Sequence, residues 1–322
     1  MKTYSITHIG FTPLIKESTS IPENIQVIGL GQACLDFLGR LKVYPEEDGK
    51  CELLDLHIQC GGPASTALVA LSRLGIHTSF LGSISDDHFG SEIAKGLKDE
   101  KVDSTYLKIT PGYTSQFAFI AITQAGAKRT VFWHRGSVPH LRAADVDLSP
   151  FSKAKILHLD GLMIEACLEA ARQARKKGLS VIMDAGTMRD RSRELVSLVD
   201  VLIASEGFAE PLVGRGAPPE KALAALRELG PKEVIITRGS KGSVGLSHKE
   251  LLFQKAFSID SVDTTGAGDV YHGGYIYGLL QGWDAPECMR FASATAALKC
   301  RQIGARKGIP GLEEIKEFLS LQ

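Results

Sequence analysis

Short apolar runs alternate with longer amphipathic stretches along most of the chain. Runs of three to five residues rich in Val, Ile and Leu predict buried strands, and apolar residues spaced three and four apart predict helices between them. The predicted strands are residues 26–30, 78–81, 156–159, 179–183, 201–203 and 234–237. The predicted helices are residues 63–74, 89–99, 164–177, 220–229, 267–281, 286–301 and 312–321. Repeated strand–helix units predict an α/β fold, a doubly wound and mostly parallel sheet flanked by helices.

Two segments break this alternation and predict a small antiparallel β lid. Residues 38–59 and 113–134 show short alternating stretches interrupted by turn residues, as antiparallel ribbons do; the second turns at Gln124-Ala125-Gly126. Ligands of a doubly wound sheet bind beyond the carboxyl ends of its strands, so ribbons projecting from that edge would cover a ligand. Residues 1–24 lack periodicity and are expected to form an arm before one domain, residues 25–322.

Composition and charge exclude several classes of protein. The 322 residues carry 37 Lys and Arg against 37 Asp and Glu, which argues against binding nucleic acid through bulk charge. No apolar run approaches the roughly 18–20 residues of a membrane span, and the amino-terminus lacks the apolar core of a secretory signal. The six cysteines form no CxxC pair, so reduced thiols are favoured. We expect a cytoplasmic protein without nucleic-acid or membrane partners.

The richest chemistry lies in the segment Asp263-Thr264-Thr265-Gly266-Ala267-Gly268-Asp269. Two hydroxyls and three small residues stand directly before a predicted helix, so backbone N–H groups and the helix dipole can hold an anion at Gly266, Ala267 and Gly268. Such an anion hole suits a phosphoryl group in transfer. Asp269 in the first helical turn is then either a cap or a general base for an incoming hydroxyl.

This segment resembles the carboxyl-terminal signature of the ribokinase-like (PfkB) carbohydrate kinases. Residues 61–67, Gly-Gly-Pro-Ala-Ser-Thr-Ala, are similar to the amino-terminal signature, and further similar pieces lie at 82–90, 237–242 and 291–310. The resemblance implies transfer of the γ-phosphoryl group of ATP to a sugar hydroxyl, with Mg²⁺. It also implies an EC 2.7.1-type enzyme that forms homodimers through its lid strands.

The resemblance assigns roles to individual residues. Asp269 would deprotonate the acceptor alcohol, and Asp36 would accept hydrogen bonds from two sugar hydroxyls, which suits a carboxylate. The remaining assignments are Gly61, Gly62 and Thr66 in the sugar pocket; Thr237, Gly239 and Gly242 beside the nucleotide phosphates and ribose; Ser293 beside the adenine; and Asp263 and Thr265 at a monovalent cation, K⁺ or Na⁺.

The sequence departs from the family pattern at two places. Thr66 stands where Asn is usual, and a hydroxyl has fewer hydrogen-bond donors than an amide. The metal and phosphate motif N-x-x-E falls on Ser205 and Phe208, so neither the amide nor the carboxylate is kept in register. Glu206 and Glu210 lie close by, and we expect one of them to serve Mg²⁺ through water.

The acceptor is expected to be a neutral pentose or ketohexose. The polar and aromatic candidates in the ribbons are Lys50, His57, Gln59, Gln116, Phe119, Trp133 and Arg135. If Lys50 and Arg135 both point inward, they favour an anionic acceptor such as a sugar acid, sugar phosphate or sulfonated sugar.

Three other functions compete with this interpretation. A nucleoside kinase uses the same machinery on another acceptor. A non-catalytic sugar- or nucleotide-binding relative would explain the loss of N-x-x-E. A dinucleotide-binding oxidoreductase is suggested by Gly29-Leu30-Gly31 after a strand, although Cys34 occupies the place of the third glycine in GxGxxG.

Overall fold

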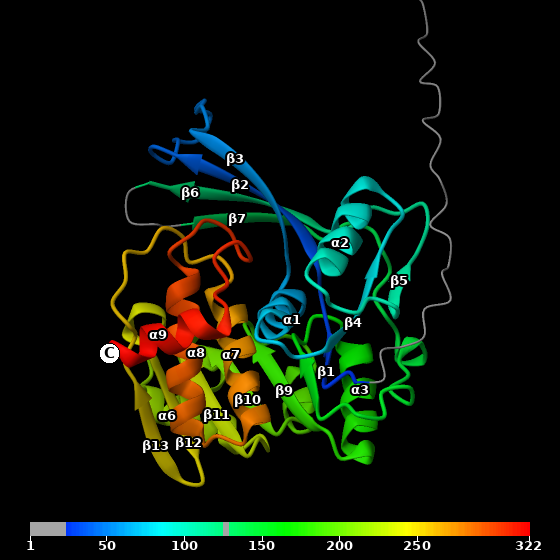
Figure 1. The fold of residues 1–322 in the computed structure, drawn as a ribbon, viewed down its shortest axis with the longest axis vertical. Coiled ribbons are helices and arrows are strands. Elements are labelled where there is room, and N and C mark those ends of the chain that lie inside the picture. The colour runs from blue at the N-terminus through cyan, green and yellow to red at the C-terminus, as the bar shows by residue number, and fades with distance from the viewer. Residues whose placement is uncertain (1–23, 125–128) are drawn as a thin grey trace, which may run out of the picture.

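The core of the molecule is a nine-stranded sheet. The computed structural model describes residues 24–124 and 129–322, and its main sheet has the strand order β13-β12-β11-β10-β9-β8-β1-β4-β5 (Figure 1). Neighbouring strands run parallel from β11 through β5, and the antiparallel pairings of this sheet are β11 with β12 and β12 with β13. The strands are β1 Val27–Leu30, β4 Thr78–Ile84, β5 Leu107–Ile109, β8 Ile156–Leu159, β9 Ser180–Ala185, β10 Val201–Ser205, β11 Glu233–Thr237, β12 Ser243–Ser247 and β13 Glu250–Gln254.

Helices cover both faces of this sheet because its central strands are apolar on both sides. In β10, Val201 and Ile203 join one buried cluster, with α1, α7 and α8, whereas Leu202 and Ala204 join the other, with α3 and α6. The helices are α1 Pro63–Arg73, α2 His88–Asp99, α3 Ile164–Lys177, α4 Ser192–Val196, α5 Glu210–Val213, α6 Pro219–Arg227, α7 Ala267–Gln281, α8 Ala285–Lys299 and α9 Leu312–Ser320. The predicted doubly wound fold is confirmed.

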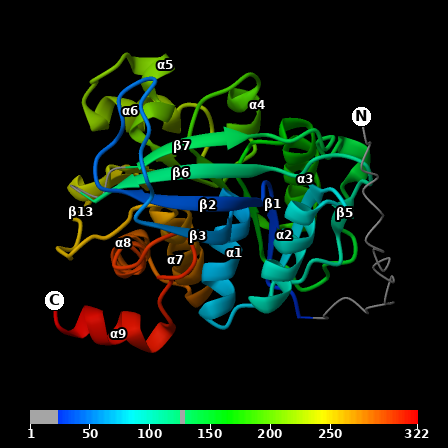
Figure 2. The ribbon, with the colours of Figure 1, turned by 90° about the horizontal axis from the view of Figure 1, so that it is seen from above.

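A second sheet lies across the carboxyl-terminal edge of the first and is called the lid here (Figures 1 and 2). Its order is β3-β2-β6-β7, from β2 Cys34–Leu41, β3 Asp55–Gly61, β6 Phe117–Thr123 and β7 Arg129–His134. Each predicted ribbon is an antiparallel pair, and the two ribbons join through a parallel pairing of β2 with β6. The parallel seam allows the two ribbons to form one continuous cover.

Alternation along the strands gives the lid two different faces. The inner face carries Asp36, Leu38 and Ile120, and its apolar members pack with Ile303 from the segment after α8. The outer face carries one row of Ile58, Phe37, Phe119 and Phe132 in register across the four strands, with Leu56 beside Ile58 on β3 in the next outer row. Leu56, Ile58 and Phe132 are each more than half exposed. The lid therefore presents polar chemistry inward and an apolar surface outward.

Two expectations lie partly or wholly outside the described residues. The predicted arm, residues 1–24, falls there except for its last residue, and so do Ala125 and Gly126 of the predicted turn. Within residues 24–124 and 129–322, no helix has the length and apolar character needed to cross a bilayer.

Candidate active site

The loop that enters α7 forms the floor of the site. Gly266 is the N-cap of α7 with φ +75°, and a Cβ built there would lie 2.7 Å from the Ala305 side chain, so the position requires glycine. Gly268, in the first turn, is exposed, and a Cβ built there would meet no atom within 4 Å. The Ala267 amide donates to the Thr264 carbonyl at 3.2 Å, so an anion hole at this turn depends on the amides of Gly266 and Gly268, next to the open space at Gly268.

Asp269 stands partly buried in the same turn and is poised to exchange a proton near neutral pH. Burial and then the charge of Asp184 raise its pKa, whereas His272 and Arg129 lower it, and together these effects place the pKa at about 7. No side-chain cap bond is formed at the start of α7. Of the two roles predicted for Asp269, the geometry favours the general base over the cap.

His272 and Asp184 connect this turn to the main sheet. The Nδ1 of His272 donates to the Gly268 carbonyl at 2.7 Å, and its Nε2 lies 3.3 Å from the Ile203 carbonyl and 3.7 Å from Asp184 Oδ1. His272 is buried, and burial raises the pKa of Asp184 while His272 lowers it. His272 and Asp184 therefore hold the Gly268 carbonyl close to the carboxyl ends of β9 and β10.

Asp36 lies on the inner face of the lid and is buried. Its Oδ1 accepts a hydrogen bond from the Cys34 thiol at 3.0 Å, and burial raises its pKa to about 6. A Cβ built on Gly61 would come within 2.0 Å of Asp36 Oδ2, so glycine is required beside this carboxylate. The charge of Asp36 also raises the pKa of Asp269, which places the two carboxylates within electrostatic reach of each other.

The turn from β3 into α1 closes the same region. Gly62 has φ +100°, and a Cβ there would lie 2.4 Å from the Gln32 carbonyl. Thr66 is buried in the first turn of α1, and its hydroxyl has no hydrogen-bond partner among the residues described. The buried guanidinium of Arg306 donates to Ser65 Oγ at 3.0 Å in that turn, and its charge lowers the pKa of Asp36.

Asp263 holds the loop before α7 in shape. Its Oδ1 accepts from the Thr265 amide at 2.9 Å and the Thr265 hydroxyl at 2.8 Å, and its Oδ2 accepts from the Gly304 amide at 2.7 Å. Its backbone carbonyl accepts from Lys299 Nζ at 2.9 Å. The two residues predicted to bind a monovalent cation are thus bonded to each other and to the segment after α8.

The lid touches this loop directly. Arg129, at the start of β7, donates through Nη1 to Thr264 Oγ1 at 2.6 Å. Gln59 of β3 donates to the Ile303 carbonyl at 3.1 Å. Residues of the lid strands therefore contact the loop before α7 and the segment after α8, although these segments are far apart in sequence. This arrangement fits the transfer of a phosphoryl group to a hydroxyl held under the lid.

The sequence matches the pfkB family carbohydrate kinase profile over residues 26–311. The chain belongs to this family. It is 30% identical over 272 residues to a ribokinase of Haemophilus influenzae, covering 81% of this chain and 88% of the relative. It is 28% identical over 282 residues to a 5-dehydro-2-deoxygluconokinase of Clostridium perfringens, covering 80% and 83%. The structure of Arabidopsis thaliana ribokinase complexed with ribose and ATP superposes with TM-score 0.81 at 25% identity, covering 92% and 99%.

As a pfkB family kinase, the protein transfers phosphate to a hydroxyl group, and its predicted nucleotide residues lie at the same sheet edge. Thr237 ends β11 and donates to the Ala204 carbonyl at 3.3 Å. Gly239 has φ +55° and open space around its Cα, and Gly242 has φ +87° and packs against the Gln254 carbonyl. Ser293 is buried in α8, which packs on α7.

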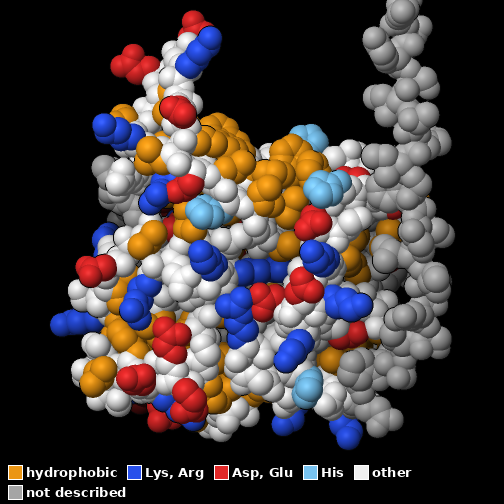
Figure 3. All heavy atoms as spheres, turned by 45° about the horizontal axis from the view of Figure 1, so that its top comes forward, with side chains coloured by type: hydrophobic (Ala, Val, Ile, Leu, Met, Phe, Trp, Pro, Cys, Tyr) orange, Lys and Arg blue, Asp and Glu red, His pale blue; other side chains and the backbone are white. Residues whose placement is uncertain are grey.

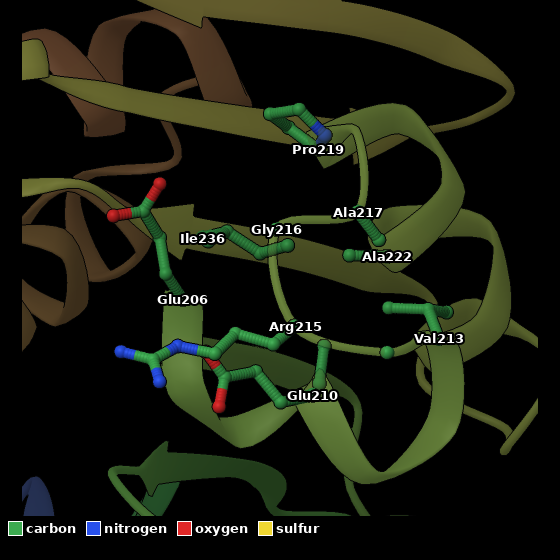
Figure 4. Close-up of a pocket in the computed structure, with 11 residues that line it drawn as sticks. Glu206, Glu210, Val213, Arg215, Gly216, Ala217, Pro219, Ala222 and Ile236 are labelled. Atoms are coloured by element: carbon green, nitrogen blue, oxygen red, sulfur yellow. The ribbon is translucent and has the colours of Figure 1, made fainter.

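The side chains in the altered N-x-x-E region of this kinase make contacts within the protein. Ser205 Oγ donates to the Gly186 carbonyl at 2.7 Å, and Phe208 is fully buried in the core. Glu206 is exposed and accepts from Arg238 Nε at 3.0 Å. Glu206 and Glu210 line a cavity of about 270 Å³ between β11 and helices α5 and α6 (Figure 4).

Of the residues of this kinase that were predicted to contact the sugar, some lie on the inner lid face, one lies on the outer face and others lie outside the lid strands. Trp133 and Gln59 share the inner row of Asp36, and His57 shares the next inner row. Phe119 is on the outer face, so strand alternation directs it away from the site. Gln116 donates to Gln32 Oε1 at 3.0 Å. The predicted charged candidates, Lys50 and Arg135, are exposed and lie outside the strands.

Five residues of the site were not predicted: Asp184, His272, Arg129, Lys299 and Arg306. Asp184 carried a usable signal, because it is a carboxylate near the carboxyl end of a predicted strand. His272 follows Asp269 by almost one helical turn, which places both on one side of α7. Arg129 had no sequence signal, because its partner Thr264 lies 135 residues later in the chain.

Proposed function

We propose that this kinase transfers the γ-phosphoryl group of ATP to a hydroxyl of a neutral pentose or ketohexose. The observation that carries the proposal is the pairing of two carboxylates under the lid, Asp36 on its inner face and Asp269 at the anion hole. One is suited to accept hydrogen bonds from two sugar hydroxyls, and the other to accept a proton.

The chemistry follows from these positions. Asp36 orients the sugar so that one hydroxyl faces Asp269. Asp269 takes the proton of that hydroxyl as its oxygen attacks the γ-phosphorus, the bond from the γ-phosphorus to the bridging oxygen breaks, and ADP leaves. The amides of Gly266 and Gly268 stabilise the charge on the transferring group, while the Ala267 amide donates to the Thr264 carbonyl and holds the turn. Thr237, Gly239, Gly242 and Ser293 border the rest of the nucleotide.

Mg²⁺ would neutralise part of the phosphate charge in this reaction. Within the described residues, no group of three or more His, Cys, Asp or Glu side chains is arranged to hold a metal. Mg²⁺ prefers to keep several waters and to bind one or two carboxylates together with substrate phosphates. Glu210, and Glu206 once it is released from Arg238, are the carboxylates we propose for that role.

We favour a neutral acceptor over an anionic one because the two carboxylates, Asp36 and Asp269, would flank it. Asp36 and Asp269 would repel a carboxylate or phosphate placed between them. The anionic alternative depended on Lys50 and Arg135 pointing inward, and both are exposed on segments outside the lid strands. Ribose, bound with ATP in the Arabidopsis ribokinase structure, is a sugar of the proposed class.

The experiment is an acceptor panel read in two ways. ATP turnover and thermal shift are measured with neutral pentoses and ketohexoses, sugar acids, sugar phosphates, sulfonated sugars and nucleosides. We expect turnover with a neutral sugar that also raises Tm. Turnover confined to anionic sugars or nucleosides would contradict the proposed acceptor class, and stabilisation without turnover by any compound would indicate a non-catalytic binder. If an anionic sugar is turned over, Lys50→Met and Arg135→Met test whether those side chains bind it.

We also propose that the kinase forms a homodimer through the lids. The outer lid face exposes Leu56 and Ile58 on β3 and Phe132 on β7, and Phe37 and Phe119 lie between Ile58 and Phe132 in the same row. Hydrophobic side chains also gather at the lid end of the molecule in Figure 3. A contiguous exposed apolar patch on a folded protein commonly marks an interface.

A further inference from the structure

We propose that the ammonium group of Lys299 is a built-in cation of the anion-hole loop, so that this kinase does not need the monovalent cation predicted at Asp263 and Thr265. The proposal goes beyond the sugar kinase function. Only its kinetic test rests on that function.

The first observation concerns the oxygens of Asp263. Both carboxylate oxygens and the backbone carbonyl already accept hydrogen bonds, from Thr265, from the Gly304 amide and from Lys299 Nζ. A bound K⁺ would have to coordinate oxygens whose lone pairs are directed at N–H and O–H donors. The Asp263 oxygens that would coordinate a cation are therefore already occupied by hydrogen-bond donors of the protein.

The second observation is the location of Lys299. Its side chain has 0% exposed surface, and its Nζ lies 2.9 Å from the Asp263 carbonyl. A buried ammonium is strongly destabilising unless charges or hydrogen bonds compensate for the lost water. Lysine is almost never fully buried without such a partner. A lysine at this position would destabilise the fold unless neighbouring charges and hydrogen bonds stabilised its ammonium group.

Several groups provide that balance. Burial lowers the pKa of Lys299 below its ordinary value, and Arg129 acts in the same direction, while the carboxylates of Asp263 and Asp269 oppose this and favour the charged ammonium. Lys299 is also in the last turn of α8, where the helix dipole favours a cation. The main chain adds further links, because the Cys300 carbonyl accepts from the amides of Val262 and Asp263.

The consequence is a fixed positive charge beneath the loop that shapes the anion hole. Asp263 connects that charge to Thr265, and Gly266 and Gly268 follow within one turn. A cation bound from solution would leave as its concentration falls, whereas a side chain on a rigid helix stays in place. Lys299 is thus a positioning residue: it acts through the loop and touches no reacting atom.

The kinetic test compares potassium with a large cation that cannot enter the site. Turnover of the wild type is measured in KCl and in choline chloride at equal ionic strength, with Lys299→Met, Lys299→Ala and the exposed control Lys307→Met. We expect wild type and Lys307→Met to have the same kcat in both salts. We expect Lys299→Met to lose about tenfold or more in kcat in both, and Lys299→Ala to recover part of the loss in KCl only.

A melting test needs no turnover and therefore separates this proposal from the sugar kinase function. We expect KCl in place of choline chloride to leave the Tm of the wild type unchanged and to raise that of Lys299→Ala by about 2 °C, through cation binding to the folded state alone. A wild type that K⁺ activates or stabilises overturns the proposal. So does a Lys299→Met variant with wild-type kcat, or a Lys299→Ala variant whose Tm is equal in both salts.

Discussion

At the scale of single residues, the site is built from carboxylates that folding holds away from water. Burial raises the pKa of Asp269 to about 7 and that of Asp36 to about 6. A folded-state pKa above the unfolded value means that the ionised carboxylate destabilises the folded chain. The same property makes Asp269 a base that can take up a proton at neutral pH. Stability and catalysis therefore oppose each other at this position.

This opposition predicts a pH-dependent gain in stability for Asp269→Asn. Near about pH 3, Asp269 is largely protonated in both states, because the unfolded Asp has a pKa of about 3.9, so the variant and the wild type should melt alike. Between about pH 4 and 7, the unfolded carboxylate ionises before the folded one, and the wild type loses stability that the amide variant keeps. Near pH 8, we expect a Tm about 2–4 °C above that of the wild type. A variant that is less stable than the wild type near pH 8 would contradict the raised pKa.

Residue-level prediction from the sequence succeeds where a local motif carries the chemistry. Asp269 and the glycines before it are recognisable because the anion hole lies within one turn of chain. Lys299 had only a weak signal, a lysine within the apolar run Ala-Ala-Leu-Lys-Cys. Its partner is a backbone carbonyl 36 residues earlier, which no local pattern encodes.

At the scale of elements, strand β7 of the lid places the guanidinium group of Arg129 beside the loop that forms the anion hole. Arg129 bonds to Thr264, and its charge lowers the pKa of Asp269. Because β7 pairs only with β6 in the lid, the position of Arg129 depends on how the lid sits over the loop. Closure of the lid over a bound sugar would thus be coupled to electrostatic support of the reaction.

This coupling predicts the behaviour of Arg129→Met. We expect kcat to fall about tenfold, because a positive charge near the transferring group is lost. The acid limb of the kcat/KM profile should also move to higher pH, since Arg129 no longer lowers the pKa of Asp269. The matched control is Arg40→Met, another inner-face arginine, which is paired with Asp55. An unmoved acid limb in Arg129→Met, or an equal shift in the control, would refute the role.

Elements with strong periodicity could be predicted from the sequence, and edge elements could not. Strand 156–159 and helices 164–177 and 267–281 have the predicted bounds. The strands β5, β12 and β13 were missed: β5 has only three residues, and β12 and β13 form antiparallel pairings beyond β11, outside the strand–helix alternation. The parallel pairing of β2 with β6 was also missed, since it joins segments about 80 residues apart.

At the scale of the whole molecule, the outer lid face predicts the oligomeric state. We expect sedimentation velocity to show a species of twice 34.7 kDa for the wild type and a monomer for Ile58→Glu, because a charge in the apolar patch disrupts the interface. The control is Phe253→Glu on β13, whose side chain is also exposed but is outside the lid. A monomeric wild type, or dissociation by the control alone, would contradict dimerisation through the lid.

The global organisation of the molecule follows from its sequence more fully than its inner contacts do. Strand–helix alternation indicated the doubly wound sheet, and the two irregular segments indicated the cover over its carboxyl edge. The distribution of charge beneath that cover depends on side chains from β2, β7, α7 and α8 meeting in space. Only the structure shows that Asp36, Arg129, Asp269 and Lys299 surround one loop.

The most direct measurement is the turnover of Asp269→Asn with the acceptor identified by the panel, alongside nucleotide affinity. We predict that kcat falls at least about a hundredfold, because the acceptor hydroxyl loses its base, while ATP binds nearly as to the wild type. Asp284→Asn, an exposed helix cap on α8 that Asn can replace, should keep wild-type turnover. If Asp269→Asn turned over at close to the wild-type rate, Asp269 would not be the base, and the proposed site would be wrong.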